Sequence, residues 1–150
     1  MQPRYAVLID AENVPSKHWP RIRDRLESTG TIMVCRIFGD FTNGRLGKWI
    51  KVAQDEALQT VMQLSGPNAC DIAIAVAAMD ILHSAKIEGI CLVSSDHDFT
   101  PLAQRLRSSG IKVHGFGEAK AKQSLRKACT SFTDLSSLSP AKPAVVAKAA

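Results

Sequence analysis

Closely spaced cysteine and histidine ligands are absent from this chain. Its four cysteines, Cys35, Cys70, Cys91 and Cys129, form no C-x-x-C pair and have no clustered histidine partners. A structural zinc site and a disulfide framework are therefore not expected, and buried thiols in a reducing compartment are the simpler interpretation.

Long apolar runs are also missing. No segment approaches the roughly 20 apolar residues that a membrane span needs, and the first ten residues, MQPRYAVLID, lack the apolar stretch of a signal peptide. We therefore expect a cytoplasmic protein with no membrane partner.

Acidic residues are scarce toward the C-terminus. The net charge is +5, and residues 99–135 contain seven Lys and Arg side chains against Glu118 and Asp134. Such a bias favours a polyanionic partner such as RNA, with Lys120, Lys122, Arg126 and Lys127 as the expected backbone-contacting residues. A scattered set of solvated lysines is the alternative explanation.

The composition changes after Leu135. Residues 136–150 (SSLSPAKPAVVAKAA) are rich in Ala, Pro, Ser and Lys, contain no acidic residue and show no clear period. We expect one folded domain over residues 1–135, followed by a flexible tail or linker over residues 136–150.

What the first 135 residues contain is an alternation of short β-branched apolar runs with longer helical patterns. This order is typical of βαβ units and predicts an α/β domain with a mainly parallel, five-stranded sheet. The predicted strands are Tyr5–Ile9, Thr31–Phe38, Thr60–Leu64, Gly89–Val93 and Ile111–Phe116, and the predicted helices are Trp19–Ser28, Gly47–Ala57, Cys70–Ser84 and Phe99–Ser108. The helix over residues 70–84 is apolar on nearly all sides, so we expect it to be largely buried.

Acidic residues follow the predicted strands at their carboxyl ends. The first strand runs into Asp10, the fourth runs into Asp96 and Asp98, and Asp71 lies in the first turn of the apolar helix. Ligands of parallel sheets bind outside the carboxyl ends of the strands, so these four carboxylates are expected to converge. Clustered carboxylates repel one another unless a cation binds them, and oxygen ligands favour Mg²⁺ or Mn²⁺.

Each of these residues also has a purely structural interpretation. Asp10 is suited to a turn, Asp71 to a favourable interaction with the helix dipole, and Asp98 to the N-cap of the next helix. Asn13 is a candidate ligand or orienting amide, and Ser95 and His97, which flank Asp96, are candidates for supporting the ligands or contacting substrate. An exposed loop histidine without a role is the alternative for His97.

Three motifs carry a family resemblance: LIDAENV at residues 8–14, GPNACDIAIAVAAMD at 66–80, and LVSSDHDFTPLAQRLRSSGIKVHGFGE at 92–118. With FGDF at 38–41 and Trp49, residues 4–135 resemble the NYN, or LabA-like, domain of the PIN-like nucleases. The resemblance implies a three-layer α/β/α sandwich, metal-dependent cleavage of RNA, an acidic site at Asp10, Asp71, Asp96 and Asp98 with Asn13 nearby, and in some relatives an additional RNA-binding domain after a linker.

The sequence departs from the family pattern at three positions, one of which lies in the apolar helix. Ala77 replaces an aspartate that family members usually carry, Pro67 replaces a frequent basic residue, and His97 replaces a common serine. Two alternatives to the ribonuclease remain open. The loss at Ala77 and the localised positive charge favour a non-catalytic RNA-binding module. The other alternative is a phosphatase of the haloacid dehalogenase kind, because residues 96–100 match the D-x-D-x-T motif of that family, but too little chain follows for its remaining motifs.

Overall fold

The computed structural model describes residues 2–42, 44–64, 66, 68–84 and 86–138. In this part of the chain, six strands form one parallel sheet in the order β3-β2-β1-β4-β5-β6. The strands are β1 (Arg4–Asp10), β2 (Thr31–Gly39), β3 (Gln59–Met62), β4 (Gly89–Val93), β5 (Lys112–Gly117) and β6 (Ser131–Asp134).

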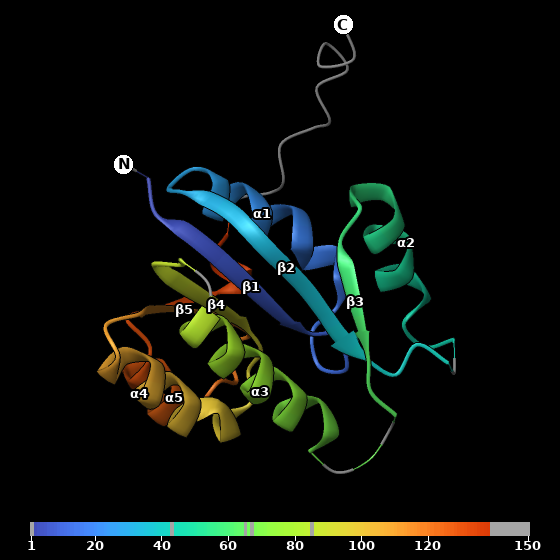
Figure 1. Cartoon of the computed structure of the whole chain (residues 1–150). Helices are drawn as coiled ribbons and strands as arrows, with labels where there is room; N and C mark the ends of the chain where they lie inside the picture. Colours follow the sequence, from blue (N-terminus) through green and yellow to red (C-terminus); the bar gives the residue numbers. More distant parts are fainter. Residues whose placement is uncertain (1, 43, 65, 67, 85, 139–150) are drawn as a thin grey trace, which may run out of the picture.

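Helices cover both faces of the sheet, which gives the three layers of an α/β/α sandwich (Figure 1). One face carries α1 (Trp19–Glu27) and α2 (Gly47–Glu56), and the other carries α3 (Ala69–Ser84), α4 (Thr100–Ser108) and α5 (Gln123–Ala128). Three short 3-10 helices, η1 (Ser16–His18), η2 (His97–Phe99) and η3 (Leu135–Ser137), lie in the connections. The predicted fold class is confirmed.

Alternating residues of β1 build the two hydrophobic cores. Tyr5, Val7 and Ile9 pack toward α1 and α2, whereas Ala6 and Leu8 pack toward α3 and α4. Side chains of a strand point to opposite faces in turn, and here both faces are covered, so every residue of these five is buried. This explains why the strand appears in the sequence as a continuous apolar run.

The five predicted strands and four predicted helices are present, with ends within two residues of those expected. The sheet of the described residues has six strands instead of the predicted five, because β6 was missed. The short helix α5 was missed as well. β6 has four residues, SFTD, with Phe132 as its only large apolar side chain, and α5 has six residues. Segments this short show no apolar run and no helical period.

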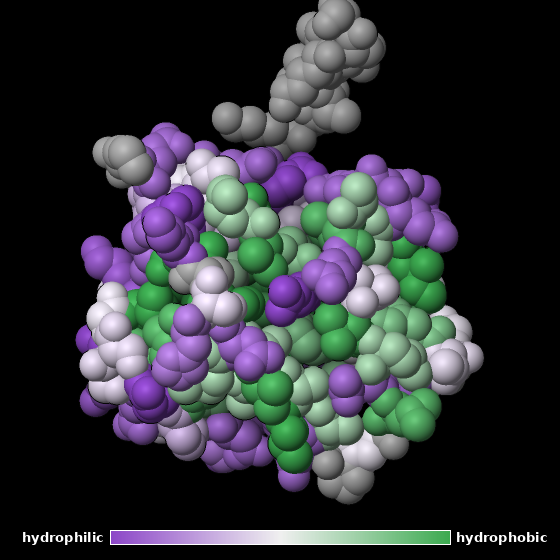
Figure 2. Space-filling view, viewed as in Figure 1, coloured by the Kyte–Doolittle hydropathy of each residue, from purple (hydrophilic) through white to green (hydrophobic). Residues whose placement is uncertain are grey.

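The expectation that α3 is largely buried was also wrong. Ile74, Ala78 and Ile81 face the sheet, but Ile72 and Val76 are 62% and 57% exposed. α3 lies across β1 and β2, so its outward side faces solvent although it carries apolar residues. Hydrophobic surface is accordingly visible on this side of the molecule (Figure 2).

The predicted tail begins inside the described residues. Leu135 starts η3, and Leu138 is buried in the core beneath α1 and α2. Residues 139–150, the remainder of the predicted tail, lie outside the described residues.

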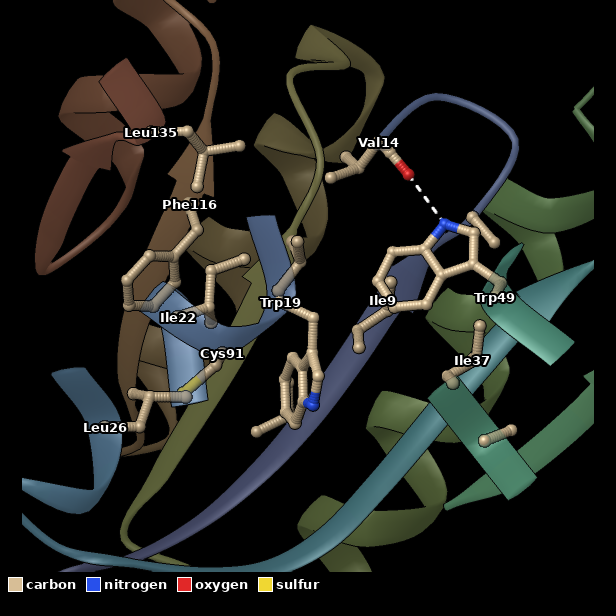
Figure 3. Packing of buried hydrophobic residues seen from close by; sticks show 14 of the residues in the cluster. Ile9, Val14, Trp19, Ile22, Leu26, Ile37, Trp49, Cys91, Phe116 and Leu135 are labelled. Atoms are coloured by element: carbon tan, nitrogen blue, oxygen red, sulfur yellow. Dashed lines mark hydrogen bonds between the residues drawn. The ribbon is translucent and has the colours of Figure 1, made fainter. Parts of the chain in front are cut away.

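Trp49 fastens α2 to the loop that follows β1. Its side chain is 2% exposed, and its indole Nε1 donates a hydrogen bond of 2.7 Å to the Val14 carbonyl (Figure 3). A buried indole N–H is normally satisfied in this way, because an unpaired donor in the core is unfavourable. The bond thereby fixes residues 11–14, which begin directly after Asp10.

We predict that Trp49→Phe lowers the free energy of unfolding by about 2 kcal/mol, since it leaves the Val14 carbonyl without a donor and removes packed volume. Urea unfolding followed by circular dichroism measures the change. Trp19→Phe is the matched comparison, because the Trp19 indole donates to the partly exposed Glu56 carboxylate at 3.0 Å instead. An equal or larger loss at Trp19 would contradict the importance given to the Val14 bond.

Candidate functional site

The candidate site lies where the order of strands reverses. From β1 the chain adds β2 and β3 on one side, then returns through α3 to β4 on the other side of β1. β1 and β4 are neighbours in register, with Ile9 opposite Val93. Open parallel sheets form a crevice at the carboxyl ends of two such strands. Asp10 follows Ile9 and Ser94 follows Val93, so both residues lie at this crevice.

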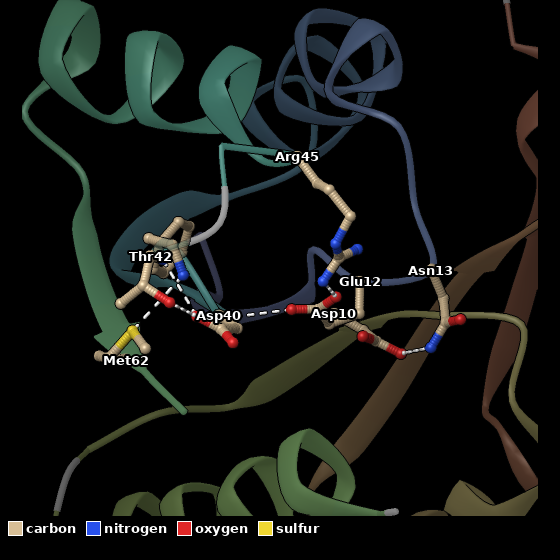
Figure 4. A network of polar contacts seen from close by, with 8 residues as sticks. Asp10, Glu12, Asn13, Asp40, Thr42, Arg45 and Met62 are labelled. Carbon is tan, nitrogen blue, oxygen red and sulfur yellow. Dashed lines mark hydrogen bonds and ion pairs between the residues drawn. The ribbon is translucent and has the colours of Figure 1, made fainter. Parts of the chain in front are cut away.

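Asp10 is the buried centre of this crevice. Its side chain is 0% exposed, and its Oδ2 accepts a hydrogen bond of 2.8 Å from Asn13 Nδ2 (Figure 4). The same oxygen accepts a hydrogen bond of 3.0 Å from Ser94 Oγ. Burial raises the pKa of the Asp10 carboxyl, and the bonds from Asn13 and Ser94 partly offset that rise. Asp10 Oδ1 is buried and has no hydrogen-bond donor among the described residues.

Asp96 is held next to Asp10 through a shared serine. Ser94 Oγ, which donates to Asp10, accepts a hydrogen bond of 3.1 Å from the Asp96 backbone N–H. The Asp96 side chain caps η2, since its Oδ1 accepts from the Asp98 N–H at 2.8 Å. The structural interpretation of Asp98 as a helix cap was therefore wrong, because Asp96 has that role and α4 has no side-chain cap.

Asp71 reaches the same group of carboxylates from α3. It lies in the first turn of that helix and shares a hydrogen bond with Asp96. Its pKa is raised to about 6, first by burial and then by the negative charges of Asp96, Asp10 and Asp98. The three segments thus bring the four predicted aspartates within electrostatic reach of one another.

His97 lies between two of these carboxylates. Its Nδ1 is 4.0 Å from Asp96 Oδ1 and its Nε2 is 3.5 Å from Asp98 Oδ1. One potential ligand atom from each of the three residues lies within 4.8 Å of the others. His97 and Asp98 are the exposed members of the group, so they lie at its solvent side.

The role that the sequence suggested for Ser95 belongs to its neighbour Ser94. Ser95 Oγ accepts a hydrogen bond of 2.7 Å from the Glu118 N–H, so it supports the loop after β5 rather than the carboxylates. Ser94, which sequence reasoning passed over, links Asp10 and Asp96. Its position opposite Asp10 in the extended register of β1 and β4 was the signal available for finding it.

Ala77 lies further along α3 than Asp71. It is partly buried against the core beneath α3, and six residues of helix place it about 9 Å along the axis from Asp71. The aspartate that the family resemblance implies at this position would therefore not be a direct neighbour of the Asp71 carboxyl.

The predicted basic residues divide into two kinds. Lys120, Lys122 and Lys127 are exposed, the first two in the loop between β5 and α5 and the third in the last turn of α5. Arg126 is used within the fold: its guanidinium donates to the carbonyls of Ala121 at 2.9 Å and Ala119 at 3.1 Å, and it lies 4.7 Å from the centre of the Phe132 ring.

The carboxylates suit a hard divalent cation in chemical type, but among the described residues only Asp96, His97 and Asp98 form a group of three whose ligand atoms all lie within 4.8 Å of one another. A hollow of about 300 Å³ opens over the group and is lined by Glu12, Asn13, Arg45, Cys70, Asp71 and Asp96, among others. We call it the acidic hollow. A carboxylate oxygen that is buried without a donor is unfavourable in itself, and a cation would satisfy Asp10 Oδ1. Carboxylate oxygens are the preferred ligands of Mg²⁺ and Mn²⁺.

Fold and site together define a parallel α/β domain with an acidic crevice at the reversal of its strand order. Residues 4–137 match the NYN domain, so the chain belongs to the NYN family, and the predicted family is confirmed. The NYN domain is a nuclease-like, RNA-related fold, and NYN and PIN-like nucleases generally use divalent metals.

Comparison with solved structures agrees on the fold. The chain is similar to MurG of Acinetobacter baumannii, with a TM-score of 0.54 and 12% sequence identity, over 95% of this chain and 43% of that one. At this identity the likeness concerns the fold alone, and the chain spans less than half of the MurG length. No curated protein matches the chain. In the described residues, no helix combines the length and the apolar character needed to cross a bilayer.

We predict that the carboxylate cluster destabilises the metal-free protein as pH rises. Because the folded state raises the pKa of Asp71 from 3.8 to about 6, its contribution to stability is complete below pH 3.8 and is lost as pH rises through about 6. In EDTA at about pH 8, Asp71→Asn should increase the free energy of unfolding by about 1 kcal/mol, after allowance for the exposure of the side chain.

Urea unfolding at about pH 4 and pH 8 measures this difference, which should be small at the lower pH. Asp80→Asn is the control, because Asp80 is an exposed residue of the same helix. Equal effects of the two substitutions at the higher pH would show that the raised pKa of Asp71 has no weight in stability.

Proposed function

We propose that this protein is a metal-dependent ribonuclease that hydrolyses RNA phosphodiester bonds at Asp10, Asp71, Asp96 and Asp98. The observation that carries the proposal is the Asp10 carboxylate, which is wholly buried and has one oxygen without a donor among the described residues. A capping or turn role satisfies a carboxylate, whereas this arrangement leaves one buried acceptor that a cation would satisfy.

The side chains of the site are held before any ligand binds. Asn13 and Ser94 fix the Asp10 carboxylate through Oδ2, and the Asp98 N–H fixes Asp96 through Oδ1. Asp10, Asp71 and Asp96 would hold the cation, with Asp98 and His97 at the solvent side. Preorganised ligands lose little freedom on binding, which favours tight and specific coordination.

Bound Mg²⁺ or Mn²⁺ supplies Lewis-acid chemistry, because it activates a water molecule and stabilises negative charge on a phosphoryl oxygen. The chain itself supplies positioning. Asp71, whose pKa is raised by burial and by its acidic neighbours, is the carboxyl that holds a proton most readily in the metal-free site. Cation binding must therefore compete with that proton below about pH 6.

We expect labelled single-stranded RNA to be cleaved in Mn²⁺ or Mg²⁺ and to remain intact in EDTA. Asp10→Asn and Asp96→Asn should each lower the cleavage rate by at least about 100-fold, because each removes a charge on which cation binding depends. Gel analysis of the products measures the rate, with Asp80→Asn as the charge-matched control.

Cleavage that persists in EDTA or in both site variants would contradict the proposed chemistry. RNA binding without cleavage in either metal would favour the non-catalytic RNA-binding module instead.

Cation binding is also measurable without RNA. Mn²⁺ should raise the Tm of the protein, since a ligand at 100 times its Kd stabilises the folded state by about 2.7 kcal/mol. Asp10→Asn should abolish the rise and Asp80→Asn should retain it. A thermal melt that Mn²⁺ leaves unchanged in the wild-type protein would argue against a cation site.

A further inference from the structure

A second hollow lies beside the acidic hollow and shares a wall with it. Its volume is about 360 Å³, and Glu12, Asn13 and Arg45 line both spaces. On its far side it is bounded by Lys17 and Lys48, together with the residues from 14 to 16 and Trp49. We call it the basic hollow, because three cationic side chains, Lys17, Arg45 and Lys48, line it.

Charge changes sign across the shared wall. The acidic hollow is lined by Asp71, Asp96 and Glu12 with Arg45 as its cation, whereas Glu12 is the sole carboxylate among the described residues that line the basic hollow. Such a juxtaposition is suited to a polyanion, because phosphates away from the cation need positive charge of their own.

Arg45 is held at this wall by a chain of polar contacts. Its Nη2 lies 2.7 Å from Glu12 Oε1, while Glu12 Oε2 accepts a hydrogen bond of 2.6 Å from the Asp40 N–H (Figure 4). Asp40 itself is buried and accepts from Thr42 at the end of β2. Glu12 is thus a positioning residue, and the Arg45 side chain remains 53% exposed while it is ion-paired.

Other contacts hold the remaining walls of the basic hollow in place. The Trp49 indole bonds the Val14 carbonyl across its base. α2 begins there without a side-chain cap and with no acidic residue in its first turn. The partial positive charge of this helix end therefore adds to the charges of Lys17, Arg45 and Lys48.

We propose that the basic hollow binds a phosphate of the RNA strand next to the one presented to the aspartates, with Arg45 as the residue between the two phosphates. This inference rests on the proposed function, because the strand is the substrate of the same site. A guanidinium is the side chain best suited to such a position, since it binds phosphate through paired N–H groups and keeps its charge at all relevant pH values.

The proposal differs from binding by the basic residues after β5. Lys120 and Lys122 follow β5, whereas Arg45 follows β2, so the two groups lie on opposite flanks of β1 and β4. An RNA strand that contacts both would cross the acidic hollow along the carboxyl edge of the sheet.

The test compares Arg45→Gln and the double variant Lys17→Gln/Lys48→Gln with wild-type protein. A fluorescein-labelled oligouridine of about 12 nucleotides is titrated in EDTA at several salt concentrations, and its cleavage in Mn²⁺ is measured separately. We expect Arg45→Gln to weaken binding about tenfold and to reduce the slope of log K against log salt by about 0.7 for each phosphate that is no longer neutralised. In Mn²⁺, KM should rise more than kcat falls, as for an interaction made equally in the ground and transition states.

Arg4→Gln and Lys86→Gln/Lys112→Gln are the matched controls. Arg4 is also ion-paired at 2.7 Å, with Glu88, but it lies at the opposite end of β1. Lys112 begins β5 and Lys86 precedes β4, so both also lie at the amino ends of the strands. These variants remove the same charge far from the basic hollow, and we therefore expect them to change the affinity by less than about twofold. Thermal melts verify that all variants are folded.

The outcomes separate this inference from the proposed function. If the basic-hollow variants bind and cleave like the controls, the inference is wrong while the ribonuclease proposal stands. If wild-type protein cleaves nothing but Arg45→Gln still weakens binding and lowers the salt slope, the inference stands and the ribonuclease proposal fails. Failure of wild-type protein to bind the oligouridine at low salt would overturn the inference as well.

Discussion

The buried carboxylate of Asp10 sets the requirement that organises this molecule. A charge at zero exposure is unfavourable unless donors or a cation surround it, and the described residues provide donors to one oxygen only. Asn13 comes from the loop after β1, whereas Ser94 follows β4, so the Ser94 bond that stabilises Asp10 also joins these two strands at the point where their order reverses. Neighbouring negative charges further disfavour the ionised forms of Asp10 and Asp71. The carboxyl edge of the sheet is therefore the part of the structure where electrostatic stabilisation is least complete.

The surrounding fold places these carboxylates together in one small region. Parallel strands buried on both faces leave their polar residues only at the ends, and crossover helices deliver their first turns to the same edge. Asp71 therefore lies close to Asp96 although the two residues are 25 positions apart in the chain. Trp49 has a similar function on the other face, because its bond to Val14 prevents the loop after Asp10 from moving independently of α2. Rigid apolar packing thus holds polar groups in a geometry that they would not adopt by themselves.

Much of this arrangement is predictable from sequence because it follows from strand ends. Asp10 and Asp96 each terminate an apolar run, and parallel topology alone brings such residues to one edge. The parts that escaped prediction depend on side-chain contacts between segments of no marked pattern. Ser94 resembles any loop serine until it is opposite Asp10, and Arg45 resembles any solvated arginine until Glu12 holds it. β6 and α5 are too short to show a period, and Ile72 and Val76 show that an apolar composition does not reveal which side of a helix is covered.

Glu12 is an acidic residue at the same edge of the sheet that has a different role from the four aspartates. It follows Asp10 by two residues, yet its carboxylate bonds the Asp40 backbone and Arg45 instead of joining the aspartates. Six acidic side chains thus lie near this edge of the sheet. Arg45 neutralises Glu12, and Asp40 accepts a hydrogen bond from Thr42 in a turn. The four that remain have no ion pair with a Lys or Arg side chain among the described residues, although His97 lies 4.0 Å from Asp96 and 3.5 Å from Asp98. A negative site flanked by a neutralised wall and a positive hollow can attract a polyanion without being saturated by it, because each phosphate meets the charge that suits its own position.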